Sequence, residues 1–112
     1  MTFKIIYLDD ESDLCEIFKE SFESDMIKIQ TFVNPEEAIK EIQSNPPDLL
    51  FLDYRLPSTT GDIIAQKLNP QLLKVLITGD LTVSPQAKYL RIFHKPFKFQ
   101  EMKDFLDSLI KK

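Results

Sequence analysis

Polar side chains that could do chemistry together follow four apolar segments of the chain. These segments end, in turn, at Asp9 and Asp10, at Asp53, at Thr78, and at Lys95. Three carboxylates held close together repel one another, which raises their pKa values unless a cation joins them. Mg²⁺ meets this need because it binds one or two carboxylates together with phosphate oxygens. Carboxylates, a lysine and a hydroxyl around Mg²⁺ favour phosphoryl transfer, in which the protein positions groups and neutralises charge.

Asp53 is the best candidate for a nucleophile in such a site. It stands alone at the end of Asp48–Asp53, an almost unbroken apolar run that is typical of a central strand covered on both faces. An aspartate can accept a phosphoryl group by forming an aspartyl phosphate. Asp9 and Asp10 are adjacent in the sequence, as metal ligands would be, so we assign them to the cation.

These side chains meet only if the apolar segments are strands of one sheet. Strands are predicted at residues 3–8, 27–32, 48–53, 72–77 and 89–93, and helical patterns separate most of them. This alternation predicts right-handed crossovers and an α/β fold with a doubly wound five-stranded parallel sheet. In such a sheet the carboxyl ends of the strands share one edge, where ligands bind. Between Thr82 and Lys88 there is room for only about one helical turn.

Length, charge and cysteine content exclude several classes of protein. The chain has 112 residues and a net charge of −4, with no basic block of the kind that a nucleic-acid-binding face would need. Cys15 is the single cysteine, so an intrachain disulfide framework and a multi-cysteine zinc site are excluded. No apolar run approaches the roughly 20 residues of a membrane span. We expect one cytoplasmic domain over residues 1–112 that contacts neither nucleic acid nor membrane, and a closing helix that reaches Lys112.

Four motifs resemble the signatures of two-component response-regulator receiver domains. They are Asp9-Asp10-Glu11, Asp53-Tyr54-Arg55-Leu56-Pro57 with Gly61, Thr78-Gly79, and Lys95-Pro96-Phe97. Each motif alone is common by chance, but all four occur in the family's order and at the ends of predicted strands. The resemblance spans essentially the whole chain and implies a flavodoxin-like sheet with the strand order 2-1-3-4-5. It also implies that a histidine kinase or a histidine phosphotransfer protein supplies the phosphoryl group.

The resemblance implies a metal-binding role for one group of residues. Asp10 would bind Mg²⁺ directly and Asp9 would bind it through a water molecule. The phosphoacceptor Asp53 and the backbone carbonyl of Arg55 would complete the protein ligands.

A second group of residues would contact the phosphoryl group itself. Thr78 would donate a hydrogen bond to one phosphoryl oxygen, and Lys95 would form an ion pair with another. Gly79 has no side chain and would leave room for the group to approach. The Lys95-Pro96 bond would be cis, as is usual in the family.

The chain departs from the family pattern in the region that transmits the signal. Receiver domains usually have an aromatic residue three places before the motif lysine, where this chain has Ile92, with Phe93 beside it. The interval from Thr78 to Lys95 is also shorter than usual, so the fourth helix is expected to be shortened or missing. We expect residues 82–88 to be irregular, mobile and held by few apolar contacts.

Two apolar residues of the first helix are expected to differ in role. In the family, the start of this helix meets the kinase or phosphotransfer partner; here we expect Leu14 to be available for docking and Ile17 to pack in the core.

Two other functions are alternatives to phosphoryl acceptance. One alternative function is a receiver-fold interaction module that works without phosphorylation. The other is a haloacid-dehalogenase-type phosphatase, which would need Asp-x-Asp after the first strand and a cap insertion.

Overall fold

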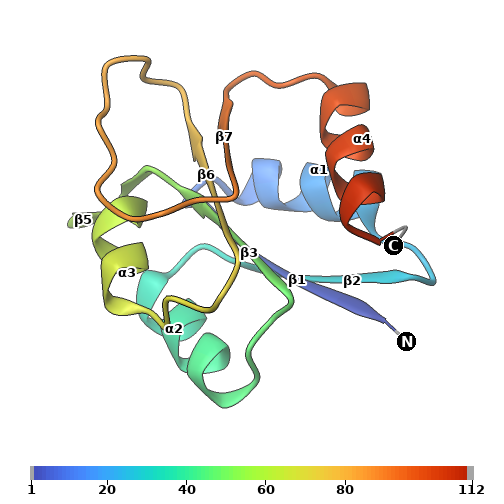
Figure 1. Cartoon of the computed structure of the whole chain (residues 1–112), viewed down its shortest axis with the longest axis horizontal. Coiled ribbons are helices and arrows are strands. Elements are labelled where there is room, and N and C mark those ends of the chain that lie inside the picture. Colours follow the sequence, from blue (N-terminus) through green and yellow to red (C-terminus); the bar gives the residue numbers. More distant parts are fainter. Residues whose placement is uncertain (1, 111–112) are drawn as a thin grey trace.

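The apolar segments form a parallel sheet of five strands in the order β2-β1-β3-β6-β7 (Figure 1). The computed structural model describes residues 2–110, and the strands of this sheet are β1 (Phe3–Leu8), β2 (Ile27–Phe32), β3 (Leu49–Asp53), β6 (Lys74–Thr78) and β7 (Arg91–His94). Every neighbouring pair in the sheet is parallel. Because β6 and β7 are its fourth and fifth strands in chain order, the predicted order 2-1-3-4-5 is confirmed.

Helices cover both faces of the sheet. Their bounds are α1 (Ser12–Phe22), α2 (Pro35–Ser44), α3 (Gly61–Lys67) and α4 (Phe99–Ile110). Helices α1 and α4 lie on one face, and α2 and α3 lie on the other (Figure 1). Side chains alternate along a strand, so Ile5 and Tyr7 enter the core under α1 and α4, whereas Ile6 and Leu8 enter the other core. The predicted extension to Lys112 lies outside the described residues. Within residues 2–110 no helix has the length and apolarity to cross a membrane.

Helix α1 shows one of our expectations to be wrong. Ile17 is 57% exposed, whereas Leu14 is half-buried. The inward face of α1 is formed by Cys15, Phe18 and Phe22, which are three and four residues apart. Ile17 is two residues from Cys15, about 200° around the helix, and therefore points away from the core.

A short hairpin follows β3 and was not predicted. Its strands β4 (Arg55–Leu56) and β5 (Thr59–Thr60) have only two residues each, too few for a recognisable alternation of apolar residues. Ser58 adopts a positive φ of 62° at the turn. The hairpin carries the chain from Asp53 to the start of α3.

The segment between β6 and β7 contains no helix, as predicted from its length. Helix α4 therefore takes the place of the fifth helix of the family that the sequence resembles. The expectation of an irregular segment with few apolar contacts did not foresee that hydrogen bonds hold its second half. The buried carboxylate of Asp62 in α3 accepts hydrogen bonds from the backbone N–H groups of Gln86 and Ala87 and from the hydroxyl of Tyr89. Long-range hydrogen bonds of this kind leave no periodic signal in the sequence.

Candidate phosphoacceptor site

The three predicted carboxylates lie together at the carboxyl edge of the sheet. Asp9 and Asp10 follow β1 and Asp53 ends the neighbouring strand β3, because parallel pairing aligns the ends of the two strands. One carboxylate oxygen from each residue lies within 4.8 Å of the other two. Asp9 and Asp53 are buried, whereas Asp10 is exposed. Two of the three charges are thus removed from water. Inside the protein their mutual repulsion is only weakly screened.

Lys95 compensates part of this negative charge. Its Nζ lies 3.0 Å from Asp9 Oδ2, 3.1 Å from Asp53 Oδ1 and 3.9 Å from Glu11 Oε2. Burial lowers the pKa of Lys95, but the hydrogen bonds and charges of Asp9 and Asp53 outweigh burial and raise it above its ordinary value. The ammonium group therefore stays charged. The Lys95-Pro96 peptide bond is cis, as the resemblance implied.

One ammonium group does not neutralise three carboxylates, and the effect is seen at Asp53. Burial and the charge of Asp9 raise the pKa of Asp53 to about 6, against the lowering effect of Lys95. A second cation bound to the same oxygens would remove this cost, since it favours the ionised form.

Thr78 and Gly79 lie on the side of the site opposite Asp9 and Asp10, at the end of β6. Thr78 is buried, and its Oγ1 accepts a hydrogen bond of 3.0 Å from the backbone N–H of Asp80. Both Thr78 and Gly79 line a cavity of about 730 Å³ that also contains Asp10, Asp53 and Lys95. A Cβ at Gly79 would meet only Lys95 Cβ, at 3.9 Å. The cavity is therefore open to a ligand next to Asp53.

Arg55 and Asp80 close one side of this cavity with an ion pair. Arg55 Nη2 lies 2.7 Å from Asp80 Oδ2, and both residues line the cavity. Asp80 also accepts hydrogen bonds from the backbone and the hydroxyl of Thr82. These bonds hold the pKa of Asp80 below its usual range. The Arg55 side chain thus fastens the start of the irregular segment to the hairpin after β3, a contact that the motif gave no reason to expect.

Comparison with known proteins agrees with this geometry. A model of the response regulator receiver domain matches residues 5–107. The chain belongs to the response regulator receiver domain family. This receiver domain is 32% identical over 73 residues to the alkaline phosphatase synthesis transcriptional regulatory protein PhoP of Bacillus subtilis (strain 168), covering 65% of the chain and 30% of PhoP. It is 25% identical over 112 residues to sporulation initiation phosphotransferase F of the same organism, covering 93% of the chain and 90% of that protein.

Solved structures show the same fold. The receiver domain superposes on a CheY-like response regulator receiver domain protein from Methanospirillum hungatei JF-1 with a TM-score of 0.88 and 18% identity, covering 99% of this chain and 95% of the other. The chain spans less than a third of several curated relatives: 30% of PhoP, and 29% of the phosphate regulon transcriptional regulatory protein PhoB of Rhizobium meliloti (strain 1021).

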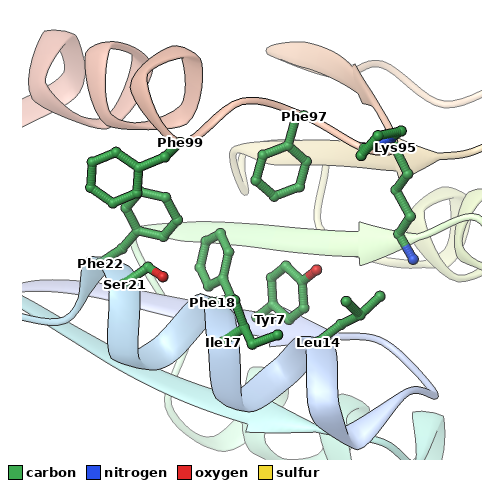
Figure 2. Close-up of a pocket in the computed structure, with 10 residues that line it drawn as sticks. Tyr7, Leu14, Ile17, Phe18, Ser21, Phe22, Lys95, Phe97 and Phe99 are labelled. Atoms are coloured by element: carbon green, nitrogen blue, oxygen red, sulfur yellow. The ribbon is translucent and has the colours of Figure 1, made fainter.

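An apolar groove lies beside the acidic site of the receiver domain, between α1 and the segment that joins β7 to α4 (Figure 2). We call it the α1 groove. Its volume is about 460 Å³, and its lining includes Leu14, Ile17, Phe22, Phe97 and Phe99. Ile17 and Phe99 are more than half exposed at its rim. Leu14, which was expected to be available for docking, lines this groove, whereas Ile17 was wrongly assigned to the core.

Tyr7 is a residue of the site that sequence reasoning missed. Its ring lines the α1 groove and its hydroxyl donates a hydrogen bond of 3.3 Å to Asp9 Oδ2. A signal was present in the sequence: residues two apart in a strand share a face, so Tyr7 points to the same side as Asp9. A tyrosine in an otherwise aliphatic strand end could have been assigned to the site on that ground.

Proposed function

We propose that this receiver domain, residues 1–112, accepts a phosphoryl group on Asp53 from the phosphohistidine of a histidine kinase or a histidine phosphotransfer protein. A carboxylate oxygen of Asp53 attacks phosphorus, the P–N bond breaks, and the imidazole leaves with the bonding electron pair. The observation that carries this proposal is the grouping of Asp9, Asp10 and Asp53 around one point, with Lys95 in contact with two of them. Such a grouping suits positioning and charge neutralisation, which dominate catalysis of phosphoryl transfer.

The donor set of this cluster fits Mg²⁺. The cation is hard and takes oxygen ligands, and three carboxylate oxygens lie within 4.8 Å of one another. We assign Asp10 and Asp53 as direct ligands, Asp9 as a ligand through water and the backbone carbonyl of Arg55 as the remaining protein ligand. When bound, Mg²⁺ would neutralise charge between the carboxylates and the incoming phosphoryl oxygens.

The other residues of the cavity act on the phosphoryl group. In the proposed complex Thr78 donates its hydroxyl proton to one phosphoryl oxygen, which requires the hydroxyl to turn from the backbone of Asp80. Lys95 pairs with another phosphoryl oxygen. Gly79 leaves the approach free, in agreement with the open space around its Cα.

We assign the α1 groove as the docking surface for the phosphodonor protein. It is apolar, it is adjacent to the acidic cluster, and Lys95 belongs to the lining of both the groove and the acidic cavity. A helix of the partner that buries Leu14, Ile17 and Phe99 would place its phosphohistidine next to Asp53. The similarity to sporulation initiation phosphotransferase F, over 90% of that protein, supports a phosphotransfer role.

Intact-mass analysis of phosphoryl uptake tests this function. With Mg²⁺ and acetyl phosphate, the wild-type protein is expected to gain the mass of one phosphoryl group, and Asp53→Asn is expected to gain none. Excess EDTA should abolish the gain, because the carboxylates then repel the phosphate. Uptake by Asp53→Asn would contradict the assignment of the acceptor. A wild-type protein that gains no mass would favour the phosphorylation-independent module, and turnover of phosphate esters would favour the phosphatase.

The affinity for Mg²⁺ is expected to depend on pH through Asp53. Because the pKa of Asp53 is about 6, the cation must displace a proton below that pH. The apparent affinity should therefore rise by up to about tenfold per pH unit below pH 6 and level off above pH 7. Calorimetric titration with Mg²⁺ at pH 5, 6, 7 and 8 measures this profile.

Asp53→Asn is the control for that profile, since its amide does not titrate. Its Mg²⁺ affinity is expected to be weaker and to vary less between pH 5 and 8. A wild-type affinity that stays constant over this range would contradict the position of Asp53 in the metal site.

A further inference from the structure

The hydroxyl of Tyr7 reaches the acidic cluster from inside the core. Tyr7 is only 2% exposed, and its ring stacks on Phe18 with a centroid distance of 4.2 Å and an angle of 18°. Figure 2 shows the ring beside Phe18 and the hydroxyl on the side that faces the end of Lys95. This packing fixes the ring, so the position of the hydroxyl is fixed as well.

The Tyr7 hydroxyl donates its hydrogen bond to Asp9 Oδ2, the same carboxylate oxygen that accepts from Lys95. Asp9 Oδ2 lies 3.3 Å from the Tyr7 hydroxyl and 3.0 Å from Lys95 Nζ, while Oδ1 accepts a bond of 3.0 Å from the backbone N–H of Glu11. The Asp9 side chain has no exposed surface. If Lys95 turns away from Asp9, the Tyr7 hydroxyl is the one side-chain donor among the described residues that remains on Oδ2.

Tyr7 is suited to remain a donor throughout. Burial, and then the negative charge of Asp9, raise the pKa of Tyr7 well above its ordinary value. The phenol therefore keeps its proton and remains a hydrogen-bond donor to Asp9 Oδ2.

We propose that Tyr7 is a positioning residue of the phosphoacceptor site: its hydroxyl holds the Asp9 carboxylate so that Lys95 can leave it for a phosphoryl oxygen on Asp53. This inference rests on the proposed function, in which Lys95 pairs with the phosphoryl group. With Tyr7 in place, the departure of the ammonium group leaves Asp9 Oδ2 with a donor. With phenylalanine there, the same movement leaves this buried carboxylate oxygen without a side-chain donor among the described residues, which is costly.

The test compares the wild-type protein with Tyr7→Phe, using beryllofluoride with saturating Mg²⁺ as the phosphoryl mimic. The ¹H–¹³C resonance of the Lys95 ε-methylene reports the movement of this side chain. We expect Tyr7→Phe to need about tenfold more beryllofluoride for half of the shift, as one buried unpaired acceptor would cause. Its affinity for Mg²⁺ alone should stay within twofold of wild type, because Lys95 need not move when the metal binds.

Tyr89→Phe is the matched control. It also removes a phenol hydroxyl that donates to a buried carboxylate, that of Asp62, but it does so away from the acidic cluster. It should lower the melting temperature and change the beryllofluoride titration by less than twofold.

Two outcomes would overturn the role of Tyr7 alone. One is a Tyr7→Phe titration equal to that of wild type. The other is a Tyr7→Phe protein whose Mg²⁺ affinity falls as much as its beryllofluoride affinity, because the hydroxyl would then support the whole cluster and not the movement of Lys95. A wild-type protein that binds no beryllofluoride with Mg²⁺ would instead overturn the proposed function, and this inference with it.

Discussion

Gly61→Ala is expected to destabilise the fold by about 2–3 kcal/mol, the range for forcing an atom into a packed site. A Cβ on Gly61 would lie 2.3 Å from the backbone oxygen of Asp53, and a backbone atom cannot move aside as a flexible side chain can. The expected loss of stability is opposite in sign to the usual effect of this substitution. Gly61 is the first residue of α3, and alanine in place of glycine in a helix otherwise stabilises the helix by up to about 1 kcal/mol. Urea unfolding of the two proteins measures the difference.

Gly79→Ala is the control for this substitution. Neither glycine has a positive φ, so neither is required by its own backbone conformation. A Cβ at Gly79 meets only Lys95 Cβ at 3.9 Å, an ordinary contact, and the stability should change by less than about 0.5 kcal/mol. If Gly61→Ala were as stable as Gly79→Ala, the close approach of α3 to Asp53 would be wrong. Because that contact is to Asp53, the proposed phosphoacceptor and metal ligand, we also expect Gly61→Ala to weaken binding of Mg²⁺.

The sequence was sufficient to predict the grouping of the carboxylates and Lys95. Lys95 and Asp9 are 86 residues apart and form a hydrogen bond, but each ends a strand of one parallel sheet. Strand ends are readable as the points where an apolar run stops, and parallel pairing then determines which of them are neighbours. The same logic placed Thr78 at the cavity. No comparable rule exists for the hairpin after Asp53, whose strands have two residues each.

The errors concern side chains whose direction depends on a single turn of helix or on distant partners. Ile17 was assigned to the core because it falls in the helical spacing that begins at Leu14. The inward face is instead centred on Cys15, Phe18 and Phe22. The segment after β6 was expected to be irregular, mobile and held by few apolar contacts because it is too short for a helix, and its hydrogen bonds to α3 were not foreseen. Its hydrogen-bond partner is Asp62, which lies 24 to 27 residues earlier in the chain. From the sequence alone, a carboxylate at the start of α3 is explained as an acidic residue of the first helical turn.

Asp62 supports the chain between β6 and β7, which contains no helix. Its carboxylate is buried and accepts hydrogen bonds from Gln86 N at 2.8 Å, Ala87 N at 3.1 Å, the Tyr89 hydroxyl at 2.5 Å and Gln66 Nε2 at 3.2 Å. Burial raises the pKa of Asp62, but these bonds to the ionised form outweigh burial and lower it below its ordinary value. Tyr89 and Ala87 also pack on the core under α2 and α3. The chain between β6 and β7 is thus held against α3 by the hydrogen bonds to Asp62 together with the apolar packing of Ala87 and Tyr89.

Asp62→Ala is expected to destabilise the protein by about 1–2 kcal/mol, because it removes the acceptor of several partly buried hydrogen bonds. Hydrogen exchange should accelerate most at the amides of Gln86 and Ala87, whose protons the carboxylate binds. Since the pKa of Asp62 is lowered on folding, its contribution is present above the unfolded value of 3.8 and is lost as the pH falls through the folded value. The stability difference between wild type and variant should therefore be constant from pH 6 to 8 and shrink below pH 4.

Asp80→Ala is the control, because it removes a more exposed carboxylate at the other end of the segment. It should lower the free energy of unfolding by less and leave the exchange at residues 86 and 87 unchanged. Unchanged exchange at these two amides in Asp62→Ala would show that apolar packing of Tyr89 and Ala87 holds the segment without the carboxylate.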